Sequence, residues 1–222
     1  ALLARRIQGE PIAYLIGHRE FWSLRLQVTP ETLIPRPETE LLVNEVLMRL
    51  SKEAALTIAD LGTGSGAIAL AIASERPHWH IVAVDKSREA LAIASKNAHD
   101  LRLTNISFQQ GNWLSSTPSF KFDAIVSNPP YIANAEWPLY ADQLRFEPKE
   151  ALLADDEGLA DIKQIIAASR QFLKSDGWLM LEHGFNQGQV VRTIAVQNGY
   201  QNVHSICDLA GHERIVVAKW LK

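Results

Sequence analysis

The segment Val126-Ser127-Asn128-Pro129-Pro130-Tyr131 places a side-chain amide and two prolines directly after an apolar run. The run from Phe122 to Val126 predicts a buried strand, and the prolines end it because proline has no N–H to donate to a sheet. The Asn128 side-chain oxygen and the Pro129 carbonyl are then free acceptors at the strand tip. An amide or an exocyclic amine could donate to both, with the Tyr131 ring over its flat face. A loop that only ends the strand is the alternative.

A second pattern, Asp60-Leu61-Gly62-Thr63-Gly64-Ser65-Gly66, lies between a predicted strand at 57–61 and a predicted helix at 67–75. Alternate glycines let the backbone turn sharply and approach a ligand at the positive end of a helix. The next strand, 81–84, ends in Asp85, where a carboxylate could accept ribose hydroxyls. Asp85 could instead cap the following helix.

Further candidates flank these two motifs. Trp113, preceded by Asn112, follows a predicted strand at 106–109 and could stack on an adenine or fill the core. Upstream, Phe21 and Trp22 begin an alternating segment, and Ile34-Pro35-Arg36-Pro37-Glu38-Thr39-Glu40 opens a helix. Phe21, Arg36 and Glu40 are therefore either substrate contacts or ordinary packing and surface residues.

The remaining pattern predicts the elements that must position these residues. Strands and helices alternate along the chain, which indicates an α/β fold whose candidate residues gather at the carboxyl ends of parallel strands. The last two strands, 203–207 and 214–220, are joined by a short connection and must be antiparallel. We expect one strand over 21–28 as an arm of a hairpin, an irregular segment from Tyr131 to Gly158, a helix at 159–173 and a strand at 178–182. The other helices are expected at 38–50, 88–101 and 187–198.

Composition narrows the class of protein. The chain has 222 residues, 47% of them hydrophobic, which is enough for one large core plus an appendage. A net charge of −3 argues against a broad nucleic-acid surface, and the single cysteine, Cys207, fits a reducing compartment. No long apolar segment or leader pattern is present, so we expect a cytoplasmic, monomeric protein without membrane or direct nucleic-acid partners. The chain begins at Ala1 inside a helical pattern, which predicts that a preceding segment is missing.

Other chemistries lack their motifs. His78 and His80 have no acid or cysteine close in sequence, so no metal site is expected. His183 at a strand end could act as a base or make an ordinary hydrogen bond. The Gly-x-Ser-x-Gly elbow of hydrolases and the Lys-Ser/Thr of a P-loop are both missing from the sequence.

Together these motifs resemble those of the class I methyltransferases that use S-adenosylmethionine and modify amino or amide nitrogen. The segments Gly9-Glu10-Pro11-Ile12-Ala13-Tyr14-Leu15, Phe21-Trp22 and 34–40 are similar to those of one family, the release factor N5-glutamine methyltransferases (PrmC/HemK). The resemblance covers the chain from Gly9 to its last strand. It implies a seven-stranded Rossmann-like sheet, mostly parallel with a C-terminal antiparallel hairpin and preceded by a β-hairpin. It also implies two parts: residues 1–36, the remnant of a helical domain plus the linker hairpin, and residues 37–222, the methyltransferase domain.

The resemblance also implies roles for individual residues. The substrate would be the glutamine of the Gly-Gly-Gln motif of release factors, and the products would include S-adenosylhomocysteine. Asn112 stands where relatives often carry an acid. Catalytic roles fall to Asn128, Pro129 and Tyr131. Cofactor binding falls to Asp60, Gly62, Thr63, Gly64, Ser65, Gly66, Asp85, Asn112, Trp113 and Asn128. Substrate binding falls to Phe21, Arg36, Glu40, Asn128, Pro129, Pro130 and Tyr131.

Four alternatives remain open from the residues alone. Adenine-N6 methylation of nucleic acid uses similar Asn-Pro-Pro-Tyr chemistry on a flipped base, but would need phosphate contacts. A ribosomal protein could supply the glutamine instead of a release factor. A non-catalytic nucleotide-binding module or an NAD-linked dehydrogenase would fit the glycines, but neither would need acceptors at Asn128.

Overall fold

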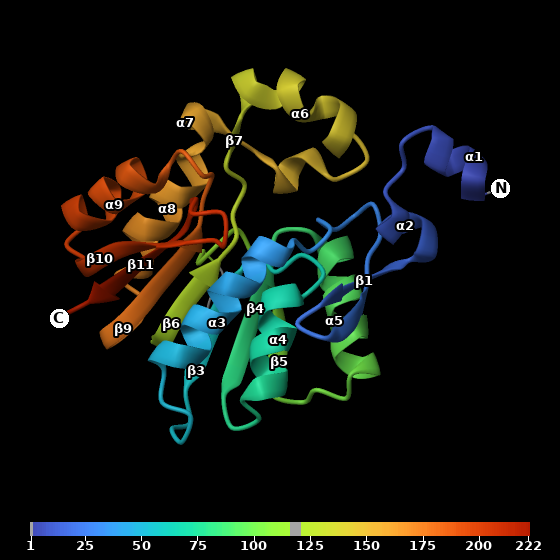
Figure 1. Ribbon diagram of the computed structural model, residues 1–222. Coiled ribbons are helices and arrows are strands. Elements are labelled where there is room, and N and C mark those ends of the chain that lie inside the picture. The colour runs from blue at the N-terminus through green and yellow to red at the C-terminus, as the bar shows by residue number, and fades with distance from the viewer. Residues whose placement is uncertain (1, 116–120) are drawn as a thin grey trace.

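Seven strands form the central sheet of this computed structural model, which describes residues 2–115 and 121–222 (Figure 1). Their spatial order is β10-β11-β9-β6-β3-β4-β5. The bounds are Thr57–Leu61 for β3, His80–Asp85 for β4, Ile106–Gln110 for β5, Phe122–Ser127 for β6, Leu173–Glu182 for β9, Gln201–Cys207 for β10 and Glu213–Trp220 for β11. The neighbouring strands β9, β6, β3, β4 and β5 are parallel to one another, and β11 pairs antiparallel with both β9 and β10. The expected sheet with its C-terminal antiparallel hairpin is confirmed.

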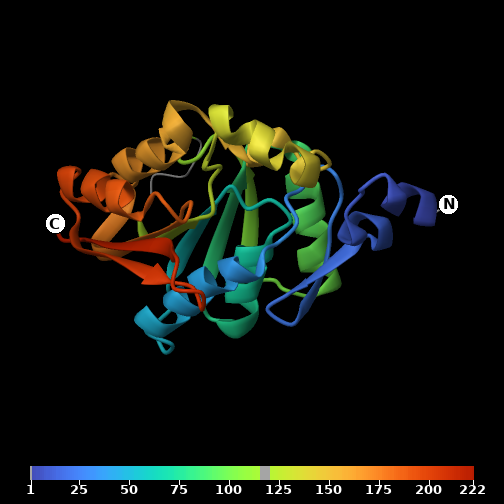
Figure 2. The ribbon, with the colours of Figure 1, turned by 45° about the horizontal axis from the view of Figure 1, so that its top comes forward.

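Helices cover both faces of this sheet. One face packs against α3 (Glu40–Arg49), α4 (Ala67–Glu75) and α5 (Arg88–Asp100), and the other against α8 (Ala160–Ser169) and α9 (Gly188–Gln197). Figure 2 shows α8 on the opposite side of the strands from α3 and α4. Because side chains alternate along a strand, Ile58 packs with α3 and α4, whereas its neighbour Ala59 packs with α8. Two apolar layers thus hold the strand tips in fixed positions.

The expected β-hairpin before the sheet is confirmed, but the single strand expected at 21–28 contains the turn of this hairpin. Strands β1 (His18–Phe21) and β2 (Leu24–Gln27) pair antiparallel, and Trp22 and Ser23 form the turn with φ of 51° and 58°. Positive φ at both turn positions is the backbone of the tight hairpin turn, which usually carries Asn-Gly. Two hydrogen bonds of Trp22 stabilise this turn in place of Asn-Gly. Its backbone N–H donates to Glu40 Oε1 at 2.8 Å, and its indole donates to Glu75 Oε1 at 2.9 Å.

The hairpin is tied to the main domain by Asn97 of α5. Its Nδ2 donates to the carbonyls of Gln27 and Ser65, and its Oδ1 accepts from the Gln27 N–H at 2.8 Å. Two short helices precede the hairpin, α1 (Leu2–Ile7) and α2 (Ile12–Ile16). The proposed division at residue 36 stays a prediction, and Ala1 lies outside the described residues.

The segment from 131 to 158 is ordered, so the expectation of an irregular loop is wrong. It holds α6 (Trp137–Leu144), α7 (Asp155–Gly158), the 3₁₀ turns η2 (Asn134–Glu136) and η3 (Lys149–Ala151), and the parallel pair β7 (Ile132–Ala133) and β8 (Leu153–Ala154). Figure 1 shows α6 above the carboxyl edge of the sheet. Elements this short carry no periodic signal, which is why the sequence did not reveal them.

Three boundaries also differ from expectation. The helix expected at 159–173 ends at Ser169, and β9 begins at Leu173 rather than at 178. The turn residues Ser175-Asp176-Gly177 lie inside β9, where the pairing register with β6 shifts. The helix expected at 38–50 opens with a 3₁₀ turn, η1 (Pro37–Thr39), before α3. Among the described residues, no helix is long and apolar enough to cross a membrane.

Candidate active site

Two cavities meet at the carboxyl ends of β3, β4, β5 and β6. The glycine-loop cavity, about 290 Å³, is lined by Gly62, Gly64, Asp85, Asn112 and Trp113, among others. The tyrosine cavity, about 340 Å³, is lined by Arg36, Pro129, Tyr131, Tyr140 and Arg214, among others. Leu33, Asn128 and Ala151 line both. The two cavities therefore adjoin at Asn128.

The glycine loop forms the floor of the first cavity. Gly62 and Gly64 have φ of 71° and 57°, a backbone conformation that most residues avoid. A Cβ placed on Gly62 would lie 3.0 Å from Cζ3 of Trp113, so the ring and the loop are in close contact. Trp113 is 8% exposed, and its indole donates to Asp161 Oδ1 at 3.1 Å, which fixes the plane of the ring. The cavity thus has a flat aromatic wall and a backbone floor.

Asp60 lies behind this loop and does not line the cavity. It is fully buried, and its Oδ2 accepts from the Thr63 hydroxyl at 2.6 Å and from the Ala69 N–H at 3.2 Å. Oδ1 has no hydrogen-bond partner, and burial raises the pKa of Asp60 to about 7. Thr63, Ser65 and Gly66 are likewise absent from the cavity lining. These residues therefore brace the loop and its helix, whereas Gly62 and Gly64 face the cavity.

Asp85 occupies the tip of β4 and lines the cavity. Its Oδ2 accepts from the Gly64 N–H at 2.8 Å and its Oδ1 from the Ser87 N–H at 2.9 Å, so both oxygens are held in place. The helix cap of α5 is Ser87, whose hydroxyl accepts from the Ala90 N–H at 3.0 Å. Asp85 is therefore not the helix cap. Each carboxylate oxygen retains lone pairs that can accept from hydroxyls of a ligand.

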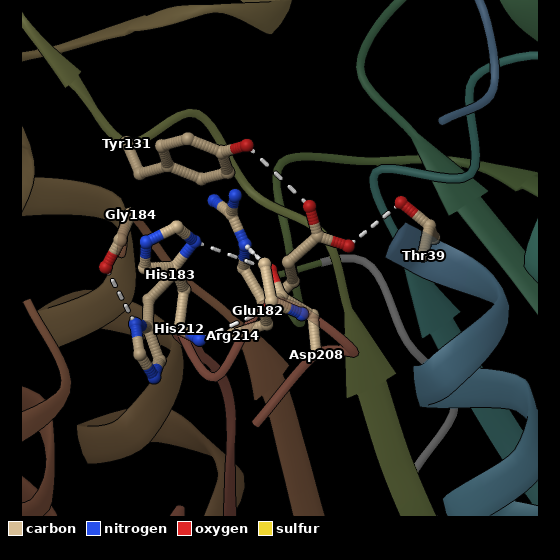
Figure 3. Close-up of polar contacts among 9 residues, drawn as sticks. Thr39, Tyr131, Glu182, His183, Gly184, Asp208, His212 and Arg214 are labelled. Atoms are coloured by element: carbon tan, nitrogen blue, oxygen red, sulfur yellow. Dashed lines mark hydrogen bonds and ion pairs between the residues drawn. The ribbon is translucent and has the colours of Figure 1, made fainter. Parts of the chain in front are cut away.

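The Asn128 side chain is oriented by two residues distant in sequence. Its Nδ2 donates to Thr39 Oγ1 at 3.1 Å, and the Thr39 hydroxyl donates to Glu182 Oε2 at 2.7 Å. Figure 3 shows Thr39 and Tyr131 on opposite sides of the Glu182 carboxylate, and the Tyr131 hydroxyl donates to Oε1 at 3.4 Å. Burial raises the pKa of Glu182 to about 7 and also raises the pKa of Tyr131. Asn128 Oδ1 has no partner among the described residues, which leaves it available to a ligand.

The Pro129 carbonyl is the second free acceptor. Ser127 is the last residue of β6 paired with its neighbours, and no described residue donates to Pro129. Both acceptors inferred from the prolines are thus present at the strand tip. Pro130 lines the glycine-loop cavity, and Tyr131 lines the tyrosine cavity.

Two arginines line the tyrosine cavity, and each is held by a carboxylate. Arg36 pairs with Glu147 at 2.5 Å, and Glu147 also accepts from the Ile34 N–H at 3.0 Å. Arg214 Nε donates to Asp208 Oδ2 at 2.8 Å, which directs the other end of its guanidinium group toward Tyr131 and Glu182. The cavity therefore offers donors on its wall and acceptors at the junction with its neighbour.

Phe21 and Glu40 are not brought to Asn128. Phe21 is 1% exposed, and both residues line a separate, open hollow of about 750 Å³ that also contains Trp22 and Glu75. Glu40 stabilises the hairpin turn through Trp22. Their substrate role stays a prediction that this geometry does not support.

Sequence reasoning missed Thr39, Glu182 and Arg214. Glu182 ends a predicted strand at the same sheet edge as Asn128, and that position was a usable signal. The neighbouring His183 is buried, its Nδ1 bonds the Gly184 carbonyl at 2.8 Å, and burial lowers its pKa, so it makes a structural hydrogen bond. Within residues 2–115 and 121–222, no cluster of His, Cys, Asp or Glu is arranged to hold a metal ion.

Comparison with known proteins gives the family. Residues 37–155 match the methyltransferase small domain. The release factor glutamine methyltransferase of Coxiella burnetii is 50% identical over 219 residues, which are 99% of this chain and 78% of that protein. The chain belongs to the release factor glutamine methyltransferase family. The resemblance found in the sequence motifs is thereby confirmed.

Solved structures agree with this family. A protein-(glutamine-N5) methyltransferase, described as release factor-specific, from Alicyclobacillus acidocaldarius is 27% identical, with a TM-score of 0.52, over 89% of this chain and all of that one. A methyltransferase from Pyrococcus furiosus has a TM-score of 0.67 at 16% identity, over 99% of this chain and 98% of that one, and so supports the fold alone. In this release factor glutamine methyltransferase family member, the matched domain contains the glycine loop, Asp85 and Asn128, whereas Glu182 and Arg214 lie beyond it.

Proposed function

We propose that this protein transfers the methyl group of S-adenosylmethionine to the side-chain amide nitrogen of the glutamine in the Gly-Gly-Gln motif of release factors. The observation that carries the proposal is the junction of the two cavities at Asn128, where an oriented amide oxygen and the Pro129 carbonyl are free acceptors. A release factor acts in translation, so the proposal places the protein in the cytoplasm.

The residues of the glycine-loop cavity fit S-adenosylmethionine. Asp85 presents fixed carboxylate oxygens to ribose hydroxyls, and the Trp113 ring offers a flat apolar wall to adenine. Asn112 can accept from the adenine amine through its side-chain carbonyl. Gly62 and Gly64 line the cavity without side chains, so the backbone can approach the ligand there. When bound, the cofactor supplies an electrophilic methyl group on a sulfonium centre.

The tyrosine cavity fits the side chain of glutamine. It opens at the surface, since its lining residue Phe185 is 54% exposed, so a side chain on a loop of a protein could enter. The Tyr131 ring gives an apolar face for the flat amide, and Asn128 and Pro129 accept from its two N–H groups. The glutamine nitrogen is thereby placed at the junction with the glycine-loop cavity.

The catalytic effect of this site is positioning and charge stabilisation. An amide nitrogen is a weak nucleophile because its lone pair is delocalised into the carbonyl group. With both N–H groups held by Asn128 and Pro129, the out-of-plane lobe of the nitrogen is directed at the neighbouring cavity. As the nitrogen forms a fourth bond it gains positive charge, and the two oxygens then accept more strongly than in the ground state. The nitrogen proton becomes acidic only after the transfer, so no general base is required before it.

An Asn128→Ala variant tests the proposal. Loss of one preorganised polar group costs about 3 kcal/mol of transition-state stabilisation, so kcat should fall about 100-fold or more. The assay is transfer of labelled methyl from S-adenosylmethionine to a release factor, with equilibrium binding of the cofactor measured in parallel. Binding should be largely retained, because Asp85 and Trp113 are unchanged. Asn44→Ala on α3 contacts neither cavity and is the matched control.

The substrate is tested with a release factor whose Gly-Gly-Gln glutamine is replaced by glutamate. Wild-type enzyme should label the unchanged factor and leave the altered factor unlabelled. Equal labelling of both factors would overturn the assignment of the glutamine. Full activity of Asn128→Ala would overturn the role of the junction.

A further inference from the structure

We propose that Thr39 and Glu182 are positioning residues that hold the Asn128 side chain with its oxygen toward the substrate and its amide N–H away from it. This inference rests on the proposed function, because it concerns how the same site orients the glutamine amide. Thr39 lies in η1 and Glu182 at the tip of β9, and 143 residues separate them in the chain.

The direction of each hydrogen bond follows from the groups involved. An ionised carboxylate can only accept, so the single hydroxyl proton of Thr39 must be donated to Glu182 across the 2.7 Å contact. The Thr39 oxygen can then only accept from Asn128, at 3.1 Å. The amide of Asn128 must therefore turn its nitrogen toward Thr39. Its oxygen is left facing the cavity junction, where the proposed reaction needs an acceptor.

This orientation is not fixed by the shape of the Asn128 side chain. The oxygen and the nitrogen of a carboxamide are almost the same size, so packing alone cannot distinguish the two orientations. A reversed Asn128 would present two N–H donors to the N–H groups of the substrate amide. The hydrogen bonds from Asn128 to Thr39 and from Thr39 to Glu182 therefore select one of the two orientations of the Asn128 amide.

Three elements surround the Glu182 carboxylate. Thr39 and Glu38 face it from η1, Tyr131 from the segment after β6, and Arg214 from β11. Burial and the negative charge of Glu38 disfavour the ionised form, whereas Thr39, Arg214 and Tyr131 favour it. Glu182 is 2% exposed, so a change in its charge is felt mainly by these neighbours.

A proton on Glu182 would reverse the direction of two hydrogen bonds, the one between Thr39 and Glu182 and the one between Asn128 and Thr39. A protonated carboxyl can donate to the Thr39 oxygen, and the Thr39 proton is then free to be donated toward Asn128. Asn128 would satisfy that donor by turning its oxygen toward Thr39, which removes the acceptor from the junction. Methyl transfer should therefore weaken as Glu182 becomes protonated, while the cofactor site is unchanged.

Thr39→Val is the first test, because valine keeps the shape of threonine and removes the hydroxyl. We expect kcat for release factor methylation to fall about 10- to 100-fold, by analogy with the loss of hydrogen-bond partners that orient metal ligands. The KM for S-adenosylmethionine should match that of Thr193→Val, an exposed position on α9. Thr39→Ser restores the hydroxyl and should recover most of the activity.

Two results would overturn this role for Thr39. One is a Thr39→Val enzyme with wild-type kcat. The other is a Thr39→Ser enzyme as impaired as Thr39→Val, since a hydroxyl that does not help has no orienting function. The serine variant decides the matter if the valine variant loses stability. A wild-type protein that methylates no release factor would instead refute the proposed function, so the two failures are distinguishable.

Glu182→Gln is the second test, because glutamine keeps an acceptor for Thr39 and cannot gain or lose the proton. Wild-type kcat should rise with pH between about pH 6 and about pH 8, whereas kcat of the variant should be nearly flat over the same range. Glu45→Gln on α3, which also changes a buried carboxyl group, should keep the wild-type profile. If kcat of Glu182→Gln rises with pH as it does in the wild type, the proposed reversal of the hydrogen bonds through Thr39 is refuted.

Discussion

Replacing Gly62 by alanine tests how closely the loop, the aromatic wall and the ligand must fit. The residue has φ of 71°, where a residue with a Cβ is disfavoured by about 1–2 kcal/mol. The new Cβ would also meet Trp113 Cζ3 at 3.0 Å, which is tighter than an ordinary contact. The ring must move by a few tenths of an ångström, and that strains the 3.1 Å hydrogen bond from its indole to Asp161. A hydrogen bond of this kind contributes about 1 kcal/mol.

Gly211→Ala separates the free-energy cost of the backbone conformation from that of the contact with Trp113. Gly211 has φ of 84°, and a Cβ there would meet nothing within 4 Å, so the variant carries the backbone cost alone. Both variants should lose similar stability from the backbone, measured as Tm. Gly62→Ala alone should weaken S-adenosylmethionine binding, by about fivefold for the additional cost of about 1 kcal/mol, as measured by calorimetric titration. If Gly62→Ala binds the cofactor as tightly as Gly211→Ala does, the Trp113 ring does not form the wall assigned to it.

Two further changes test the segments around the site. Glu147→Gln weakens the charged hydrogen bonds to Arg36 and the Ile34 N–H, so the free energy of unfolding should fall by about 1–3 kcal/mol. Residues 31–33 line the glycine-loop cavity beside Ile34, so cofactor release in stopped flow should become faster. An unchanged release rate would show that Glu147 does not hold this segment against the cavity. The folded-state pKa of Asp60 is raised to about 7, so its stabilising contribution is complete below about pH 4 and is lost as pH rises through about 7. Asp60→Asn should therefore gain in Tm relative to wild type from about pH 4 to about pH 7, and a constant difference would contradict a buried, titrating Asp60.

The sheet and the Asn128 tip were predictable because their signals are local. Apolar runs define the parallel strands, and prolines at 129 and 130 end one of them in a way that leaves acceptors unpaired. The glycine loop was recognisable because it lies between a predicted strand and a predicted helix. Each of these inferences needs only a few neighbouring residues.

The orientation of Asn128 was not predictable in this way. Thr39 and Glu182 meet only because η1 and β9 are brought together in the folded protein, and nothing in the segment 34–40 indicates that Thr39 contacts Glu182. Trp22 and Ser23 form a tight turn without glycine or asparagine, supported by contacts with Glu40 and Glu75 on distant helices. In both cases tertiary contacts decide the local structure, and a single sequence does not show them.

The residues that line only one of the two cavities come from different parts of the chain. The glycine-loop cavity uses residues before 152 only, whereas the tyrosine cavity adds Gly184, Phe185, Asn186 and Arg214 from the C-terminal strands and their connections. A lineage could therefore change which amide-bearing molecule it accepts by altering the C-terminal third of the chain while leaving the methyl donor site intact. Asn128 and its two neighbours at the boundary, Leu33 and Ala151, would be the positions least free to diverge.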